Sequence, residues 1–322
     1  MVEPAALAIT GATATGKTAL AVAVARRLDG EVVSMDSRQV YRGMDIGTAK
    51  ATPAERGGVP HHGLDLVAPD ERYSAGAFAR DARGWIAAMR ARGRVPVLAG
   101  GTGFFLRALM EPLFAEPPLD RERRGALRAW LGRRSLEAVR RMAGALDPAA
   151  GGGGRQRLER RIEVALLTGR TLGWWHRAAP PEAPPLAVLV CVLELPRRAL
   201  YRRIDARVSG MAHAGLVEEV RKLVERYGRD AAGMSATGYG EVAAHLAGEC
   251  PLEDALDATR RATRRYARRQ LTWFRNQLPD APRLDGTRPL EELAEEVAAL
   301  WRLATGQVQP AHHGGLDEEE GT

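Results

Sequence analysis

The chain has 322 residues, 45% of them hydrophobic and 27% charged, which is the balance of a soluble globular protein of about two domains. Its formal net charge of +7 favours a polyanionic partner. Only Cys191 and Cys250 are present, without CxxC spacing, which excludes a disulfide framework and predicts a reducing compartment. The longest apolar run, residues 186–195, is about half of what spans a bilayer. No leader-like segment opens the chain, so we expect a cytoplasmic protein that does not enter a membrane.

A phosphate-binding loop follows the first apolar segment. Gly11, Gly16, Lys17 and Thr18 fit the pattern G-x-x-x-x-G-K-[ST], between a predicted strand and a predicted helix. A loop pinned by glycines can turn its N–H groups toward phosphate oxygens, at the positive end of the next helix. Lys17 adds a positive charge, and the Thr18 hydroxyl can bind a magnesium ion. The loop predicts a di- or triphosphate ligand without identifying it.

A carboxylate stands where the second strand ends. Ligands of open α/β sheets lie at the carboxyl ends of the strands, so Asp36 is expected to face the phosphate loop. The polar residues 37–50 are interpreted as a loop over the site, and His61-His62 as a loop feature. Further strands are predicted over 31–35, 63–67 and 95–99, and a helix over 75–92. The strand 95–99 ends in Gly-Gly-Thr instead of the magnesium-binding Asp of a motor or signalling NTPase, which argues against an ordinary ATPase.

From about Leu113 the sequence becomes arginine-rich and helical. Helices are predicted over 120–131, 135–146 and 155–168, and a strand resumes after the proline pairs at 180–181 and 184–185. We interpret 113–185 as a helical insertion in an α/β domain. Its arginines suit either solvated helix faces or a phosphate backbone.

The last third is mainly helical. The spacing of Arg203 and Arg207 places both on one face of a helix over 197–208. A helix over 253–278 alternates arginines with aromatic residues, which suits either RNA binding or an amphipathic helix with its rings in the core. Two more helices are expected over 213–227 and 290–303. The predicted fold is a P-loop NTPase-like parallel sheet flanked by helices. It comprises 1–112 and 186–306, with the helical insertion domain 113–185 and a disordered tail over 307–322.

Seven blocks, in this order, resemble the bacterial tRNA dimethylallyltransferases, the IPP transferase family. They are GATATGKT (11–18), MDSRQVYRGMDIGTAK (35–50), VPHHGLDLV (59–67), YSAGAF (73–78), LAGGTGFF (98–105), GYGE (238–241) and RRQLTWFR (268–275). The resemblance covers about residues 7–280. It implies transfer of a dimethylallyl group from dimethylallyl diphosphate to N6 of adenosine 37 in the tRNA anticodon stem-loop, with release of diphosphate. It also implies a magnesium cofactor and a monomer.

The resemblance also implies roles for individual residues. Asp36 is similar to the family's general base, Thr102 to a threonine beside the reacting groups, and Arg203 to an arginine at the diphosphate. The implied diphosphate-binding residues are Gly11, Ala12, Thr13, Ala14, Thr15, Gly16, Lys17, Thr18 and Arg203, with Thr18 as the magnesium ligand. The implied tRNA-binding residues are Asp36, Ser37, Arg38, Gln39, Thr102, Arg124, Gln156, Arg157, Leu158, Glu159 and Arg160. Before Gln156 the chain departs from the family pattern, because a longer stretch is shortened here to AAGGGGR.

Two alternatives stay open at this stage. A small-molecule kinase of the nucleoside-monophosphate kinase type shares the loop and the sheet, but does not need the basic helical half. An adenylate isopentenyltransferase uses the same donor on free AMP. A non-catalytic RNA-binding module would leave Asp36 without a purpose.

Overall fold

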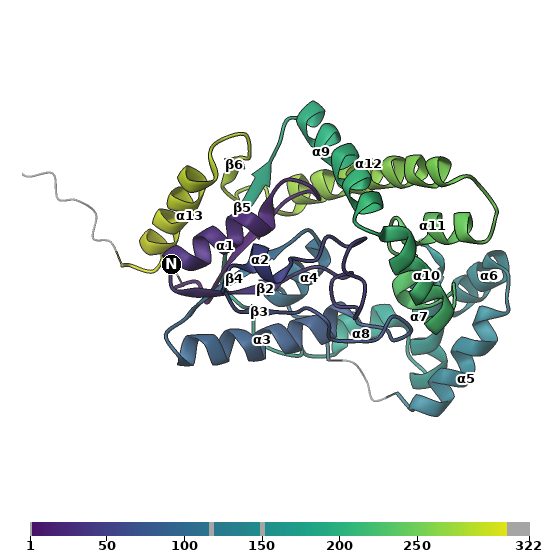
Figure 1. The fold of residues 1–322 in the computed structure, drawn as a ribbon. Coiled ribbons are helices and arrows are strands. Elements are labelled where there is room, and N and C mark those ends of the chain that lie inside the picture. Colours follow the sequence, from purple (N-terminus) through teal and green to yellow (C-terminus); the bar gives the residue numbers. More distant parts are fainter. Residues whose placement is uncertain (1, 116–118, 149–151, 308–322) are drawn as a thin grey trace, which may run out of the picture. The chain divides into compact units, whose positions relative to one another are not determined.

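The computed structural model describes residues 2–115, 119–148 and 152–307 (Figure 1). The chain forms two compact units, which we call the α/β unit, up to Glu111 and from Pro185 onward, and the helical unit, Pro112–Pro184. No helix in the described ranges is both long and apolar enough to cross a bilayer. The predicted disordered tail lies outside the described residues, apart from Gln307.

The α/β unit is built on a parallel sheet with the strand order β3-β2-β4-β1-β5-β6. The strands are β1 (Ala6–Thr10), β2 (Gly30–Ser34), β3 (His61–His62), β4 (Val95–Gly100), β5 (Val188–Glu194) and β6 (Arg283–Asp285). The central strand β1 pairs with β4 and β5, and Ile9 lies opposite Ala99 and Cys191. All five residues of β1 are buried, because helices cover both faces of a parallel sheet. This explains why its sequence is continuously apolar and does not alternate.

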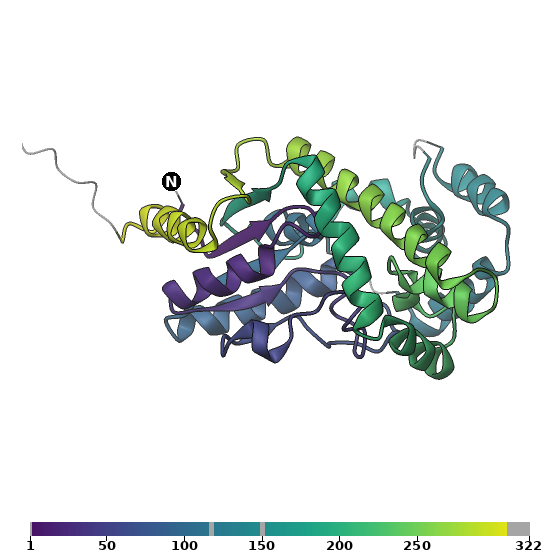
Figure 2. The same ribbon diagram turned by 45° about the horizontal axis from the view of Figure 1, so that its top comes forward.

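Helices cover the two faces and the carboxyl ends of the strands (Figures 1 and 2). The helices are α1 (Lys17–Arg27), α2 (Pro53–Arg56), α3 (Ala75–Ala91), α4 (Gly103–Met110), α9 (Arg197–His213), α10 (Leu216–Tyr227), α11 (Tyr239–Leu246), α12 (Leu252–Gln277) and α13 (Leu290–Ala304), with a 3₁₀ turn at Ala232–Ser235. Helices α1 and α13 pack together on one face, where Val24 and Trp301 join the same core as Ile9. Helices α3 and α4 lie on the other face (Figure 1). Helix α9 packs along α12, and both contribute residues to the candidate site.

The third strand is not where the sequence pattern placed it. The prediction was residues 63–67, whereas β3 is His61–His62, which pairs with β2; the loop interpretation of the two histidines was therefore wrong. Gly63 has φ +80°, and a Cβ there would lie 2.6 Å from the Ser34 carbonyl oxygen. Asp65 also has a positive φ of 56°. These left-handed turns carry the chain off the sheet edge, and local apolar alternation does not reveal them.

The loop of residues 37–50 is held down by a partly buried carboxylate. The Glu219 carboxylate on α10 accepts the backbone N–H groups of Asp45, Ile46 and Gly47 at 2.7–3.0 Å. It also accepts the Tyr239 hydroxyl at 2.6 Å. Three main-chain donors converging on one carboxylate fix the loop that forms one wall of the site.

The helical unit has a small core of its own. Its helices are α5 (Arg121–Gly132), α6 (Leu136–Leu146), α7 (Arg155–Thr168) and α8 (Leu172–Ala178). Helices α5, α6 and α8 are preceded by the N-cap residues Asp120, Ser135 and Thr171, whose side chains accept an N–H of the first turn. The buried core residues are Leu131, Val139, Ala143, Leu158 and Ile162.

Candidate active site

The phosphate loop has the geometry that its glycines predict. Gly11 and Gly16 have φ values of +145° and +104°, and a Cβ at Gly11 would lie 2.3 Å from the Leu193 carbonyl oxygen. Helix α1 then begins at Lys17, so its free N–H groups face the loop. Lys17 donates from Nζ to the Ala12 carbonyl at 2.6 Å, and Thr15 donates its hydroxyl to the same carbonyl at 2.9 Å.

Helix α9 adds two arginines to this loop. Arg203 donates from Nη1 to the Thr15 carbonyl at 2.9 Å. Arg207, one turn further along, lines the neighbouring cavity and comes close enough to Lys17 to affect its titration. Burial lowers the pKa of Lys17 to about 7, with the charge of Arg207 acting in the same direction and Asp36 opposing both. Clustered cations beside a cradle of N–H groups make a site for a multiply charged anion.

Asp36 stands at the carboxyl end of β2, as expected, and is oriented by its neighbours. The Arg38 backbone N–H donates to Asp36 Oδ1 at 2.8 Å. The Ser37 N–H donates to the Thr102 hydroxyl at 3.0 Å, which joins the ends of β2 and β4. Tyr266 of α12 lies beside the Thr102 hydroxyl, and burial, with the Asp36 charge, raises the pKa of Tyr266 to about 12. The tyrosine is therefore a neutral phenol at physiological pH.

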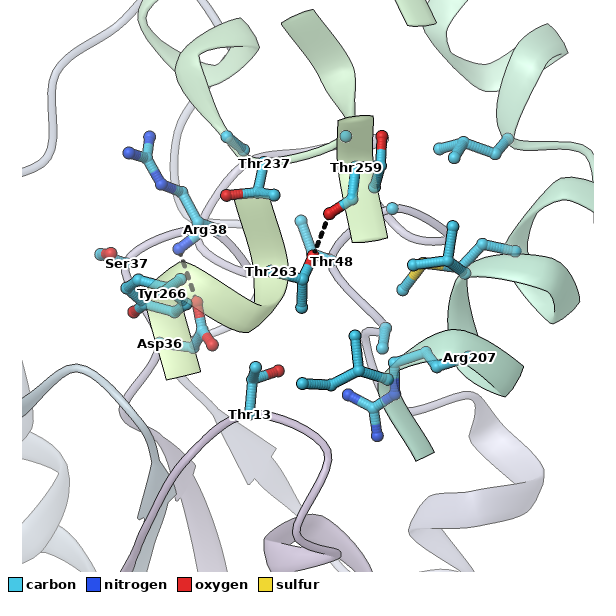
Figure 3. A pocket seen from close by; sticks show the side chains of 18 of the residues that line it. Thr13, Asp36, Ser37, Arg38, Thr48, Arg207, Thr237, Thr259, Thr263 and Tyr266 are labelled. Carbon is cyan, nitrogen blue, oxygen red and sulfur yellow. Dashed lines mark hydrogen bonds between the residues drawn. The ribbon is translucent and has the colours of Figure 1, made fainter. Parts of the chain in front are cut away.

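A cavity of about 270 Å³ opens between these elements (Figure 3). Thr13 of the phosphate loop and Asp36 both line it, together with Arg207 and Tyr266. Another part of the wall is apolar and consists of Ile204, Val208, Met211, Leu216 and Ala236. The threonines of α12 turn their protons away from the cavity, because Thr259 and Thr263 donate to the carbonyls four residues earlier. The cavity thus joins a carboxylate, a phosphate loop and an apolar wall.

The other predicted residues of the α/β unit divide into two groups. Ser37 and Arg38 line the cavity with Asp36, whereas Lys17, Thr18, Thr102 and Arg203 are not among its lining residues. Gln39 is used within its own loop. Its amide donates to the Thr48 and Ala49 carbonyls and accepts the Ser34 hydroxyl.

The predicted tRNA contacts of the helical unit lie on α5 and α7. Gln156 and Arg157 are exposed at the start of α7. Leu158 is 2% exposed in the core of the unit, so its side chain has no surface for a ligand. Glu159 accepts from Arg155 at 2.7 Å.

Arg124 and Arg160 both approach the buried carboxylate of Glu163. The distances from Glu163 Oε2 are 3.1 Å to Arg124 Nε and 3.6 Å to Arg160 Nη1, and Arg128 also donates to Glu163. Burial alone raises the pKa of Glu163, but the hydrogen bonds and charges of Arg128 and Arg124 outweigh it, and the net pKa is lowered. Arg124 and Arg128 therefore connect α5 to α7, whereas the pair of Arg160 and Glu163 lies within α7.

Several site residues were not predicted from the sequence. Arg207 was placed on the face of Arg203 but given no role. Tyr266 and Gln270 were hidden in a run whose rings suited either RNA stacking or a helix core. In the structure Phe274 is 1% exposed in the core and Tyr266 forms part of the cavity wall. The spacing of Thr259, Thr263, Tyr266 and Gln270 is a helical period that could have indicated one inward face.

The parallel sheet has a phosphate loop after β1, and a cavity that contains a carboxylate lies beside that loop. These features define a P-loop α/β protein whose site suits a multiply charged anion. The IPP transferase family model matches residues 39–277, and a related model, isopentenyl transferase, matches residues 4–63. The chain belongs to the IPP transferase family, and it is an enzyme of the prenyltransferase class.

Relatives cover nearly the whole chain. A tRNA dimethylallyltransferase of Anaeromyxobacter dehalogenans is 46% identical over 84% of this chain and 91% of its own. The crystal structure of a Bacillus halodurans tRNA isopentenylpyrophosphate transferase has a TM-score of 0.69 at 36% identity, over 94% of this chain and 96% of that one. A eukaryotic dimethylallyltransferase described as acting on tRNA has a TM-score of 0.73 at 25% identity, over 94% and 76%.

Proposed function

We propose that this protein transfers a dimethylallyl group from dimethylallyl diphosphate to N6 of adenosine 37 in tRNA and releases diphosphate. One observation carries the proposal. The phosphate loop, through Thr13, and the carboxylate of Asp36 line the same cavity, so a leaving diphosphate and a proton acceptor can serve one reaction centre. The kinase alternative is not favoured, because the relatives over the full chain are transferases of this family.

The residues divide the chemistry between the two reacting ends. The adenine N6 lone pair is delocalised into the ring, so N6 is a poor nucleophile until a base takes its proton. Asp36 accepts that proton as the N6–C bond forms, and the allylic C–O electron pair leaves with the diphosphate. Lys17, Arg203 and Arg207 stabilise the charge that develops on the leaving oxygens. The Thr102 hydroxyl accepts the Ser37 N–H and thereby fixes the backbone next to the general base, Asp36.

Magnesium fits the donors that the phosphate loop offers. Thr18 is exposed in the first turn of α1, and no side-chain hydrogen bond is described for its hydroxyl. Within the described ranges, no group of three or more Asp, Glu, His or Cys side chains is placed to bind a metal ion. Such a donor set suits Mg²⁺, which takes few protein ligands and completes its shell with phosphate oxygens and water. When bound, Mg²⁺ would neutralise charge on the diphosphate; Thr18 is the residue that would hold it.

The apolar wall gives the five-carbon group a place in the cavity. Val208, Met211 and Leu216 present aliphatic side chains next to Arg207. A prenyl diphosphate has the same polarity, with a charged head and an apolar tail. A free nucleotide lacks the tail, which supports a prenyl donor over ATP as the ligand.

Recognition of tRNA is assigned partly to the helical unit. Gln156 and Arg157 are exposed, and arginines on an RNA stem read backbone geometry more than sequence. The target adenine has to leave the anticodon-loop stack to enter a cavity, as for other enzymes that act on bases. We expect a monomer, since one chain holds the phosphate loop, Asp36 and the cavity. We also expect a cytoplasmic protein, because its two cysteines form no disulfide framework.

The decisive experiment supplies dimethylallyl diphosphate and Mg²⁺ to the enzyme with undermodified tRNA, followed by nucleoside mass analysis. Adenosine 37 should gain one dimethylallyl group for each diphosphate released. Transfer to AMP without tRNA would support an adenylate isopentenyltransferase instead. ATP consumption with phosphorylation of a nucleotide would support a kinase.

A further inference from the structure

One side of α12 connects two loops of the site, the phosphate loop and the loop of Gly101 and Thr102. Tyr266 and Gln270 are four residues apart and therefore lie on the same face of the helix. Gln270 is 6% exposed; its Oε1 accepts the Thr13 backbone N–H at 2.9 Å, and its Nε2 donates to the Gly101 carbonyl at 2.8 Å. One end of the amide meets a donor and the other an acceptor, so these two partners determine its orientation.

The two partners belong to opposite sides of the reaction. Thr13 lies in the phosphate loop, which binds the leaving group. Gly101 precedes Thr102, whose hydroxyl accepts the Ser37 N–H next to Asp36. A Cβ at Gly101 would lie 2.3 Å from Gln270 Nε2, so the close approach of the amide depends on glycine at this position.

We propose that Gln270 is a positioning residue that sets the distance between the phosphate loop and the Gly101-Thr102 loop. It thereby aligns the donor with the base Asp36. The inference rests on the proposed function, and it assigns a purpose to the RRQLTWFR block that the reaction itself does not use. Gln270 is buried between two main-chain segments and so touches neither substrate. A displacement of about 1 Å between reacting groups costs up to about 100-fold in rate.

The first test is Gln270→Met, which keeps the length of the side chain and removes both hydrogen bonds. We expect kcat to fall about 10- to 100-fold, with tRNA affinity unchanged. Inorganic diphosphate, titrated in the presence of Mg²⁺, should bind more weakly, because the Thr13 N–H is no longer restrained. Gln277→Met is the matched control, since Gln277 is exposed on the last turn of the same helix. Thermal unfolding of both variants checks that they are folded.

The second test is Gln270→Glu, which separates loss of positioning from loss of activity through disturbed packing. A protonated carboxylic acid offers one O–H donor for the Gly101 carbonyl and one acceptor for the Thr13 N–H, whereas the carboxylate offers no donor. Burial raises the pKa of such a carboxyl. The ratio of its kcat to that of the wild type should therefore rise as the pH is lowered below neutrality. The charged and titratable side chains of the site, Lys17, Asp36, Arg207 and Tyr266, are the same in both proteins, so the ratio removes the contribution that they share. The same ratio for Gln270→Met should stay flat.

Two results would overturn the assignment. One is a folded Gln270→Met with the kcat of the wild type, and the other is a Gln270→Glu ratio that does not change with pH. A wild-type enzyme that transfers no dimethylallyl group would refute the proposed function instead, so the two failures are distinguishable.

Discussion

Asp36 is the residue that we propose as the general base, and its surroundings indicate how it would act. The Arg38 N–H already engages Oδ1, which leaves Oδ2 to take the proton from N6. Asp36→Asn keeps the shape and removes the base. We expect the single-turnover rate constant to fall about 10²- to 10⁴-fold. The affinity for tRNA should change little, because the proton moves only in the transition state. A variant that keeps most of its kcat would remove Asp36 from the mechanism.

Arg207 has a different task, because it faces the cavity as a permanent cation. If it holds the diphosphate, Arg207→Ala should raise the KM for dimethylallyl diphosphate about 10- to 100-fold, as expected when a charged hydrogen bond is lost. Arg207→Lys should recover part of the loss, because the charge remains while the planar fork is gone. Arg202→Ala, an exposed arginine of the same helix, serves as the control. An unchanged KM for the donor in Arg207→Ala would place the diphosphate elsewhere.

At the scale of elements, Glu163 connects α7 to α5 through Arg124 and Arg128. Glu163→Gln leaves partly buried guanidinium groups without their carboxylate, and should lower the free energy of unfolding by about 1–3 kcal/mol. Because the pKa of Glu163 is lowered in the folded state, its contribution is complete above the pKa of the unfolded chain. It is lost as the pH falls through the folded-state value.

Denaturant unfolding across a pH series measures this difference. The wild type and Glu163→Gln should differ most near neutral pH and converge in acid. Glu137→Gln is the control, since Glu137 forms an exposed pair with Arg141, and such pairs contribute about 0–1 kcal/mol. Equal stabilities of wild type and Glu163→Gln at neutral pH would mean that these arginines are not held by the carboxylate.

At the scale of the whole molecule, the question is where the net charge of +7 meets RNA. Arg157 is exposed on α7, whereas Arg160 approaches Glu163, so Arg157 is the cleaner probe of a phosphate contact. Arg157→Ala should weaken tRNA binding equally for different tRNAs. The slope of log affinity against log salt should become shallower by about 0.7–0.9. Arg140→Ala, exposed on α6, is the comparison. Affinity and slope like those of the wild type would make Arg157 part of a solvated face.

The sequence by itself determined the parts that depend on local pattern. The phosphate loop, Asp36 at a strand end and the long helices follow from glycine spacing and apolar periodicity, and those patterns act over a few residues. The ordered blocks also indicated the family. The third strand was misplaced because positive φ at Gly63 and Asp65 overrides the apolar pattern around them.

Only the tertiary structure decided which distant residues work together. Gln270 meets Thr13 across 257 positions and Gly101 across 169, and no local pattern contains such a pairing. The tertiary structure also decided that Leu158 belongs to a core and that Arg124 and Arg128 of α5 approach Glu163 of α7. In the sequence the arginines resemble a solvent-exposed basic helix surface. Charge spacing along one helix does not reveal which carboxylate of another helix lies against its arginines.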